Sequence, residues 1–199
     1  ADGRGGQYLR VYPELGLLIV MTGGGCTIDD ALPQIAAAVT NDWRALLPNP
    51  AGEAKLADAV TEVGRPPRPE PVRPVPPAAM GASGKTYVFE NNAVSVTSLR
   101  FDFTSSNEAV MTLGTADEQA PRVNRVGMDG IFRPSIAGRA AIARASWEDE
   151  AEATLQVEYS EGPGLNNFIV DVGFRGDRLD FEIRGSGLDE PVKLVGVAQ

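Results

Sequence analysis

Histidine is absent from this sequence, and cysteine occurs once, as Cys26, among its 199 residues. Without histidine the chain lacks the commonest metal ligand and general base, which excludes Ser-His-Asp and Cys-His catalysis within it. A single cysteine can form neither an internal disulfide nor a cysteine-based zinc site. We therefore expect no metal, and no motif indicates a cofactor.

Positive charge is scarce as well. The sequence has 18 Lys and Arg residues and 27 Asp and Glu residues, which gives a formal net charge of -9. Binding to a phosphate backbone requires basic patches, so nucleic-acid partners are excluded. No run reaches the roughly 18 apolar residues that a membrane-spanning helix needs, and no signal peptide is recognisable. A hydrophobic content of 43% predicts a globular chain with a real core.

The N-terminal residues have the pattern of a β-hairpin. Residues 8–12 and 17–21 are predicted strands, and Pro-Glu-Leu-Gly at residues 13–16 is the turn between them. The second strand is apolar on both faces, which is typical of a strand with neighbours on both sides. Two strands alone are marginal in water, so we expect the chain to begin inside a larger domain.

An amphipathic helix is predicted after the hairpin. Its apolar stripe consists of Leu32, Ile35, Ala36, Val39, Trp43, Leu46 and Leu47. Residues 1–47 are therefore predicted to be two strands and a sheet-packing helix of an incomplete α/β domain.

Residues 48–82 are predicted to contain a short helix, residues 53–63, and a proline-rich linker. Seven of the twelve residues from 66 to 77 are proline, which favours an extended polyproline II conformation. We place a domain boundary in this segment. Recognition of the segment by a proline-binding domain stays an open alternative to a plain linker.

From residue 83 to residue 199, hydrophobic and polar residues alternate with a period of two. About eight segments alternate well enough to be strands with one buried face: residues 86–89, 95–103, 109–113, 140–147, 153–159, 167–174, 178–184 and 192–197. Residues 122–126 and 131–132 are a candidate further pair. The regular spacing predicts an antiparallel eight-stranded meander barrel of lipocalin-like form. Such a barrel can hold one small apolar ligand or be filled by its own side chains.

Two parts of the chain resemble one known family. Residues 5–15 and 17–24 resemble the third-motif strand and the following strand of serine β-lactamase-related hydrolases, the class C and penicillin-binding-protein superfamily. Residues 84–92, 127–130, 145–149 and 174–181 are similar to the β-domain appended to the C-terminus of such hydrolases. The resemblance implies that the chain is the C-terminal portion of a hydrolase, with the end of the catalytic domain followed by an accessory barrel.

The catalytic residues of that family are not found in this chain. A Ser-x-x-Lys motif supplies the nucleophile and its activating amine there, and a Tyr-x-Asn motif supplies a second polar pair, but neither occurs here. The third motif, Lys/His-Thr/Ser-Gly, falls on residues 1–3 or 4–6, which lack the first two residue types. We therefore expect no catalytic residue within this chain and no hydrolytic activity from it alone.

The resemblance also indicates where substrate would lie and what the chain would contact. Glycines before the first strand let a ligand come close to the backbone, or they form a bulge. The candidate substrate-binding residues are Gly3, Arg4, Gly5, Gly6 and Gln7. The expected partner is the N-terminal catalytic segment or a second copy of the chain, and the family implies an extracytoplasmic location. The alternative function is a stand-alone β-barrel that binds a ligand or another protein.

Overall fold

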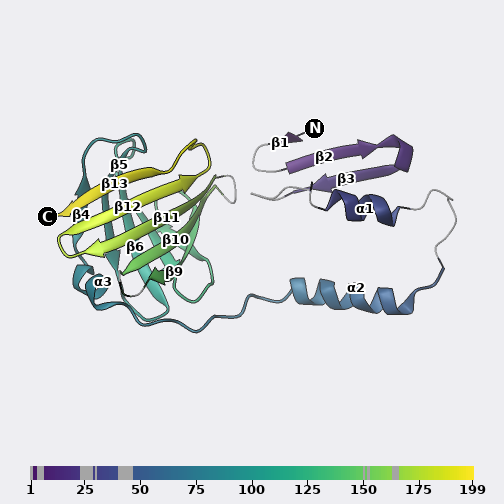
Figure 1. The fold of residues 1–199 in the computed structure, drawn as a ribbon, viewed down its shortest axis with the longest axis horizontal. Helices are drawn as coiled ribbons and strands as arrows, with labels where there is room; N and C mark the ends of the chain where they lie inside the picture. The colour runs from purple at the N-terminus through teal and green to yellow at the C-terminus, as the bar shows by residue number, and fades with distance from the viewer. Residues whose placement is uncertain are drawn as a thin grey trace. The chain divides into compact units, whose positions relative to one another are not determined.

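The computed structural model describes residues 2–3, 7–22, 29, 31–39, 47–149, 151, 153–162 and 166–199. The chain divides into two compact units. The first runs to Arg68, and the second contains Pro69–Gln199. We expected the barrel domain to begin at residue 83, whereas the barrel unit includes the end of the proline-rich segment. Figure 1 labels the α-helices and most of the strands of the two units.

The first unit contains a small antiparallel sheet in the order β1 (Asp2–Gly3), β2 (Gln7–Tyr12) and β3 (Leu17–Met21). A 3-10 turn, Pro13–Leu15, joins β2 to β3 and ends at Gly16, whose φ of 59° is in the left-handed region that favours glycine. The hairpin predicted from the sequence is therefore present.

Two helices follow in the same unit. Helix α1 (Leu32–Ala38) is shorter than predicted, and its face lines a small cavity together with the hairpin. Residues 40–46 of the predicted stripe, Trp43 included, lie outside the described residues, and Leu47 is exposed coil. Helix α2 (Pro50–Val63) begins after Asn49, whose side-chain oxygen accepts a hydrogen bond of 3.0 Å from the backbone N–H of Gly52.

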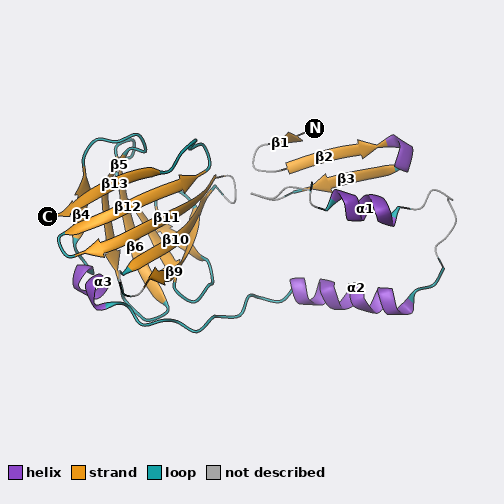
Figure 2. Cartoon of the chain, viewed as in Figure 1, coloured by secondary structure: helices purple, strands orange, loops and turns teal. Residues whose placement is uncertain are grey.

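The second unit is a closed antiparallel barrel of ten strands in the part of the chain that the structure describes, instead of the eight predicted (Figure 2). The two additional strands are β7 and β8. Residues 122–126, one half of the candidate further pair, lie in β7, and residues 131–132, the other half, directly precede β8. The strands are β4 (Thr86–Phe89), β5 (Val96–Asp102), β6 (Glu108–Thr115), β7 (Arg122–Gly127), β8 (Arg133–Ala137), β9 (Ala141–Asp149), β10 (Thr154–Glu161), β11 (Asn166–Arg175), β12 (Arg178–Gly185) and β13 (Val192–Ala198).

The barrel closes where its last strand, β13, pairs with its first, β4, in a register that places Val197 opposite Val88. Every other neighbour in the ring is adjacent in sequence, so hairpins build the barrel. The junction of β7, β8 and β9 is irregular, because the chain folds back sharply after Gly127. A Cβ atom at Gly127 would lie 1.8 Å from the carbonyl oxygen of Ile131, so only glycine fits there.

One end of the barrel is covered by the segment that precedes β4. Helix α3 (Pro77–Ala82), which the sequence reasoning did not predict, packs against β11 and buries Ala79 and Ala82 completely or nearly so. The backbone N–H of Phe103, just after β5, donates a 3.0 Å hydrogen bond to the Ser83 hydroxyl. An aromatic cluster fills the barrel at this end: Phe101, Phe103, Trp147 and Phe174.

The extended residues 69–76 are fixed to the outside of the barrel next to this end. The backbone N–H of Glu70 donates to the carbonyl of Asp129 over 2.9 Å, and Arg73 Nη1 donates to the carbonyl of Trp147 over 3.0 Å. Val72 and Val75 pack against the hydrophobic core. The proline-rich segment therefore includes a structural part of the barrel unit, not only a linker.

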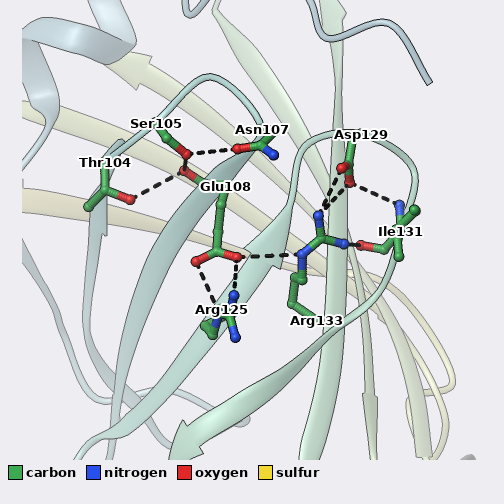
Figure 3. Close-up of polar contacts among 8 residues, drawn as sticks. All are labelled: Thr104, Ser105, Asn107, Glu108, Arg125, Asp129, Ile131 and Arg133. Atoms are coloured by element: carbon green, nitrogen blue, oxygen red, sulfur yellow. Dashed lines mark hydrogen bonds and ion pairs between the residues drawn. The ribbon is translucent and has the colours of Figure 1, made fainter. Parts of the chain in front are cut away.

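A chain of ion pairs holds the turn that receives Glu70 (Figure 3). Arg133 Nη2 donates to Asp129 over 2.8 Å, and Arg133 Nε lies 3.4 Å from Glu108. Glu108 also accepts two hydrogen bonds from Arg125, and this contact in particular lowers the pKa of the Glu108 carboxyl. The turn is therefore fixed by charged contacts on its outer side.

Candidate functional site

Two of the five predicted substrate-binding residues, Gly3 and Gln7, lie in the described part of the N-terminus. Gly3 pairs with Gln7 across β1 and β2, and Gln7 is exposed. The other three predicted substrate-binding residues, Arg4, Gly5 and Gly6, lie outside the described residues.

A cavity of about 370 Å³ lies within the barrel at the end opposite α3. Strand β5 connects the two ends of the barrel. It begins at Val96 in the cavity wall and ends at Asp102, next to the end that α3 covers. Residues that alternate inward along the strands, together with Val94 and Leu188 from two loops, supply the apolar part of the wall. These residues are Val94, Val96, Leu99, Met111, Leu113, Phe168, Val170, Phe181, Ile183 and Leu188.

A buried ion pair lies in one side of this cavity. Arg122 begins β7 and Glu161 ends β10, and the Arg122 Nη1 atom donates to Glu161 Oε1. The two side chains are only 8% and 7% exposed. Because each ion is costly to bury alone, the pair is stable only as long as both partners are present.

Two further charges complete an alternating network. Glu118 accepts two hydrogen bonds of 2.8 Å from Arg122, and Arg139 Nη2 lies 3.1 Å from the same carboxylate. Arg139 also reaches Glu161 over 3.5 Å. The contact with Glu118 raises the pKa of Arg122, and the same contact lowers the pKa of Glu118.

Tyr159 lies next to this network in the cavity wall. The residue is 5% exposed, and its hydroxyl has no hydrogen-bond partner among the residues that the structure describes. Burial, and then the negative charge of Glu161, raise the pKa of Tyr159 to about 12. The phenol is therefore neutral, and it lies beside the charged network in a mainly apolar wall.

Asp117 is the other acid in the wall. The nearby hydroxyl of Thr115 is the first cause that lowers its pKa, and the charges of Arg122 and Arg139 add to it. Asp117 forms no ion pair with any described residue, so its charge is not neutralised by direct contact.

The residues of the cavity were not predicted as a site. The apolar wall residues were assigned to the core, and the charged ones fall at strand ends. Arg122 and Glu161 are 39 residues apart in sequence, and the pairing of β9 with both β7 and β10 brings them together. No local spacing could have indicated this contact.

The cavity combines a mainly apolar wall with a few polar groups, which is the pattern of a small-molecule binding site. Within the described ranges no group of three His, Cys, Asp or Glu side chains is positioned to hold a metal ion. No helix in the described part is long and apolar enough to cross a membrane. The chain matches no protein-family model, and no curated protein matches it either.

Proposed function

We propose that this chain is a binding module whose barrel holds a small, largely apolar molecule in the end opposite α3. The observation that carries the proposal is the cavity of about 370 Å³ with its aliphatic and aromatic wall. Binding sites for small molecules have volumes in this range, and they combine a mainly apolar wall with a few polar groups. Here Tyr159, Asp117 and the Arg122 network supply the polar groups. A lipocalin-like mode, with one ligand in the mouth of the barrel, is the finer form of this proposal.

Filling the cavity is expected to abolish binding of a neutral apolar probe. Leu113→Trp places a larger side chain in the wall, so the affinity for N-phenyl-1-naphthylamine should fall at least about 10-fold, which corresponds to about 1.4 kcal/mol. Fluorescence titration measures the affinity. Val195→Trp adds the same side chain to an exposed position on β13 and should leave binding unchanged.

Thermal unfolding followed by circular dichroism separates loss of the cavity from loss of the fold. Should Leu113→Trp unfold the barrel, Ile183→Trp tests another part of the same wall. Equal binding by the wild type, the wall variants and Val195→Trp would show that the probe binds outside the barrel and would overturn the proposal.

We propose a second function for the first unit, in line with the resemblance to serine hydrolases: β2 and β3 belong to the sheet of an α/β domain of that type. The supporting observation is that one face of the hairpin is apolar and open. Leu9, Val11, Leu18 and Val20 are 44 to 61% exposed and form the cross-strand pairs Leu9 with Val20 and Val11 with Leu18. Helix α1 lines the other face, and a helical layer on both faces is typical of such sheets. The proposed occupant of the open face is therefore a helix of the same domain.

With the open face uncovered, the chain produced alone is expected to self-associate through it. Val20→Lys places a charge in the centre of the face and should shift sedimentation velocity profiles toward the monomer across a concentration series. Val60→Lys on α2, where Val60 is 66% exposed, is the matched control and should leave the profiles unchanged. A wild-type chain that stays monomeric at every concentration would contradict this second proposal.

A further inference from the structure

The chemical class of the barrel ligand follows from the charges around the cavity, and this inference rests on the binding function proposed above. Among the described residues, the loops and strand ends on the cavity side are rich in acids. They carry Glu90, Asp117, Glu118, Glu161, Asp189 and Glu190, against the basic Arg122 and Arg139. The cavity wall includes Val94 and Leu188, which come from the same loops as Glu90 and Asp189.

The basic residues at this end are already neutralised. Arg122 and Arg139 alternate with Glu118 and Glu161 in the network described above. Two further cations near this end, Arg184 and Lys193, face outward and pair with Asp171 and Glu182. No cation in the described part of this end is left for an anionic ligand.

Several acids remain without such a contact. Asp117, Asp189, Glu190 and Glu90 form no ion pair with another described residue. A wall of low dielectric below a ring of negative charge concentrates the field at the opening, which attracts cations and repels anions. A carboxylate could gain a cation only by competing with Glu118 and Glu161 for Arg122 or Arg139, and displacing Glu161 would leave a buried charge unpaired.

The polar group in the wall agrees with this charge pattern. The hydroxyl oxygen of Tyr159 receives no hydrogen bond from a described residue, although the side chain is buried in the cavity wall. An ammonium group supplies N–H donors and no acceptor, so it suits an opening whose unpaired groups are carboxylates.

We infer that the ligand of the barrel cavity is an apolar molecule that carries a positively charged nitrogen. Its apolar body lies against the aliphatic and aromatic wall, and its nitrogen lies toward Asp117 at the opening. This assignment makes the site selective by charge as well as by size.

Three molecules with the same alkyl chain and different head groups test the inference on the full chain. Decylammonium, decanol and decanoate are each used to displace N-phenyl-1-naphthylamine below their micelle-forming concentrations. Decylammonium should bind about 10-fold more tightly than decanoate at low salt, with decanol between them. Added salt should reduce the difference in affinity between decylammonium and decanoate, because it screens exposed charges.

Charge-removing variants locate the source of the preference. Asp117→Asn, Asp189→Asn and Glu190→Gln combined should weaken decylammonium binding about 5-fold and leave decanol binding unchanged. Glu148→Gln, Asp149→Asn and Asp177→Asn, at the other end of the barrel, change the net charge equally and should leave both affinities unchanged.

The outcomes separate the two proposals. If neither the probe nor any of the three molecules binds, the binding function itself is wrong. If all three molecules bind and decanoate binds as tightly as decylammonium, the binding function holds and the charge inference is overturned. Equal losses of decylammonium binding in both triple variants would also overturn it, because net charge alone would then be the cause.

Discussion

Replacement of Arg122 by Met is expected to lower the free energy of unfolding of the barrel by about 3–5 kcal/mol. Met fills much of the space of the arginine side chain, but it leaves the Glu161 carboxylate without its main partner. Glu161 is 7% exposed, so water cannot solvate it well. Urea unfolding followed by circular dichroism measures the change in the free energy of unfolding.

The double variant Arg122→Met, Glu161→Gln provides the control. Removing both charges eliminates the unpaired ion, so the double variant should recover at least about half of the stability that the single variant loses. A loss below about 1 kcal/mol in the single variant would show that Glu161 is solvated and that the network is a surface feature.

Removal of residues 69–82 is expected to have the second large effect. A chain of residues 69–199 should unfold cooperatively, whereas residues 83–199 should be destabilised by at least about 3 kcal/mol or lose cooperative unfolding. The physical reason is that α3 buries Ala79 and Ala82 against the barrel, and Val72 and Val75 pack on the core. Thermal and urea unfolding of the two chains give the comparison.

Binding of a hydrophobic dye supplies a second readout for this truncation. The aromatic cluster of Phe101, Phe103, Trp147 and Phe174 lies near the end that α3 covers, so the shorter chain should bind more dye. Equal stability of the two chains would show that residues 69–82 are a linker, as the proline content alone had suggested.

The antiparallel barrel could be predicted from the sequence because its signal is local. Alternation with a period of two marks each strand, and strands that pair with their sequence neighbours need no long-range information. The ring holds ten strands instead of eight, since β7 and β8 are joined by an irregular turn with a weak pattern. Residues 131–132 were the candidate strand, but β8 begins only at Arg133. The sharp turn after Gly127 occupies the residues before it.

Helix α3 was not predicted from the sequence, for a different reason. Pro76 and Pro77 end a segment with seven prolines in twelve residues, and that composition favours an extended chain. Proline is nevertheless well tolerated in the first turn of a helix, where its missing N–H costs nothing, and Pro77 occupies that position. Packing on the barrel then stabilises a helix too short to form alone.

The candidate site depends on contacts that no local pattern encodes. Arg122, Glu118 and Arg139 lie at or near turns, where charged residues are ordinary surface features. Glu161 and Tyr159 come from a strand on another part of the ring. Pairing of β9 with both β7 and β10 places these side chains around one cavity. The predicted N-terminal site rested on the glycines before the first strand and on a resemblance, and Arg4, Gly5 and Gly6 of that site lie outside the described residues.

The central claim is that the barrel holds its ligand in the end opposite α3. A two-dimensional amide NMR titration of the full chain with N-phenyl-1-naphthylamine tests this claim most directly. The claim predicts that the largest shift changes occur at cavity residues such as Val94, Leu113, Phe168 and Ile183, and that exposed Val195 is unaffected. Shift changes confined to β2 and β3, with the cavity residues unchanged, would contradict it.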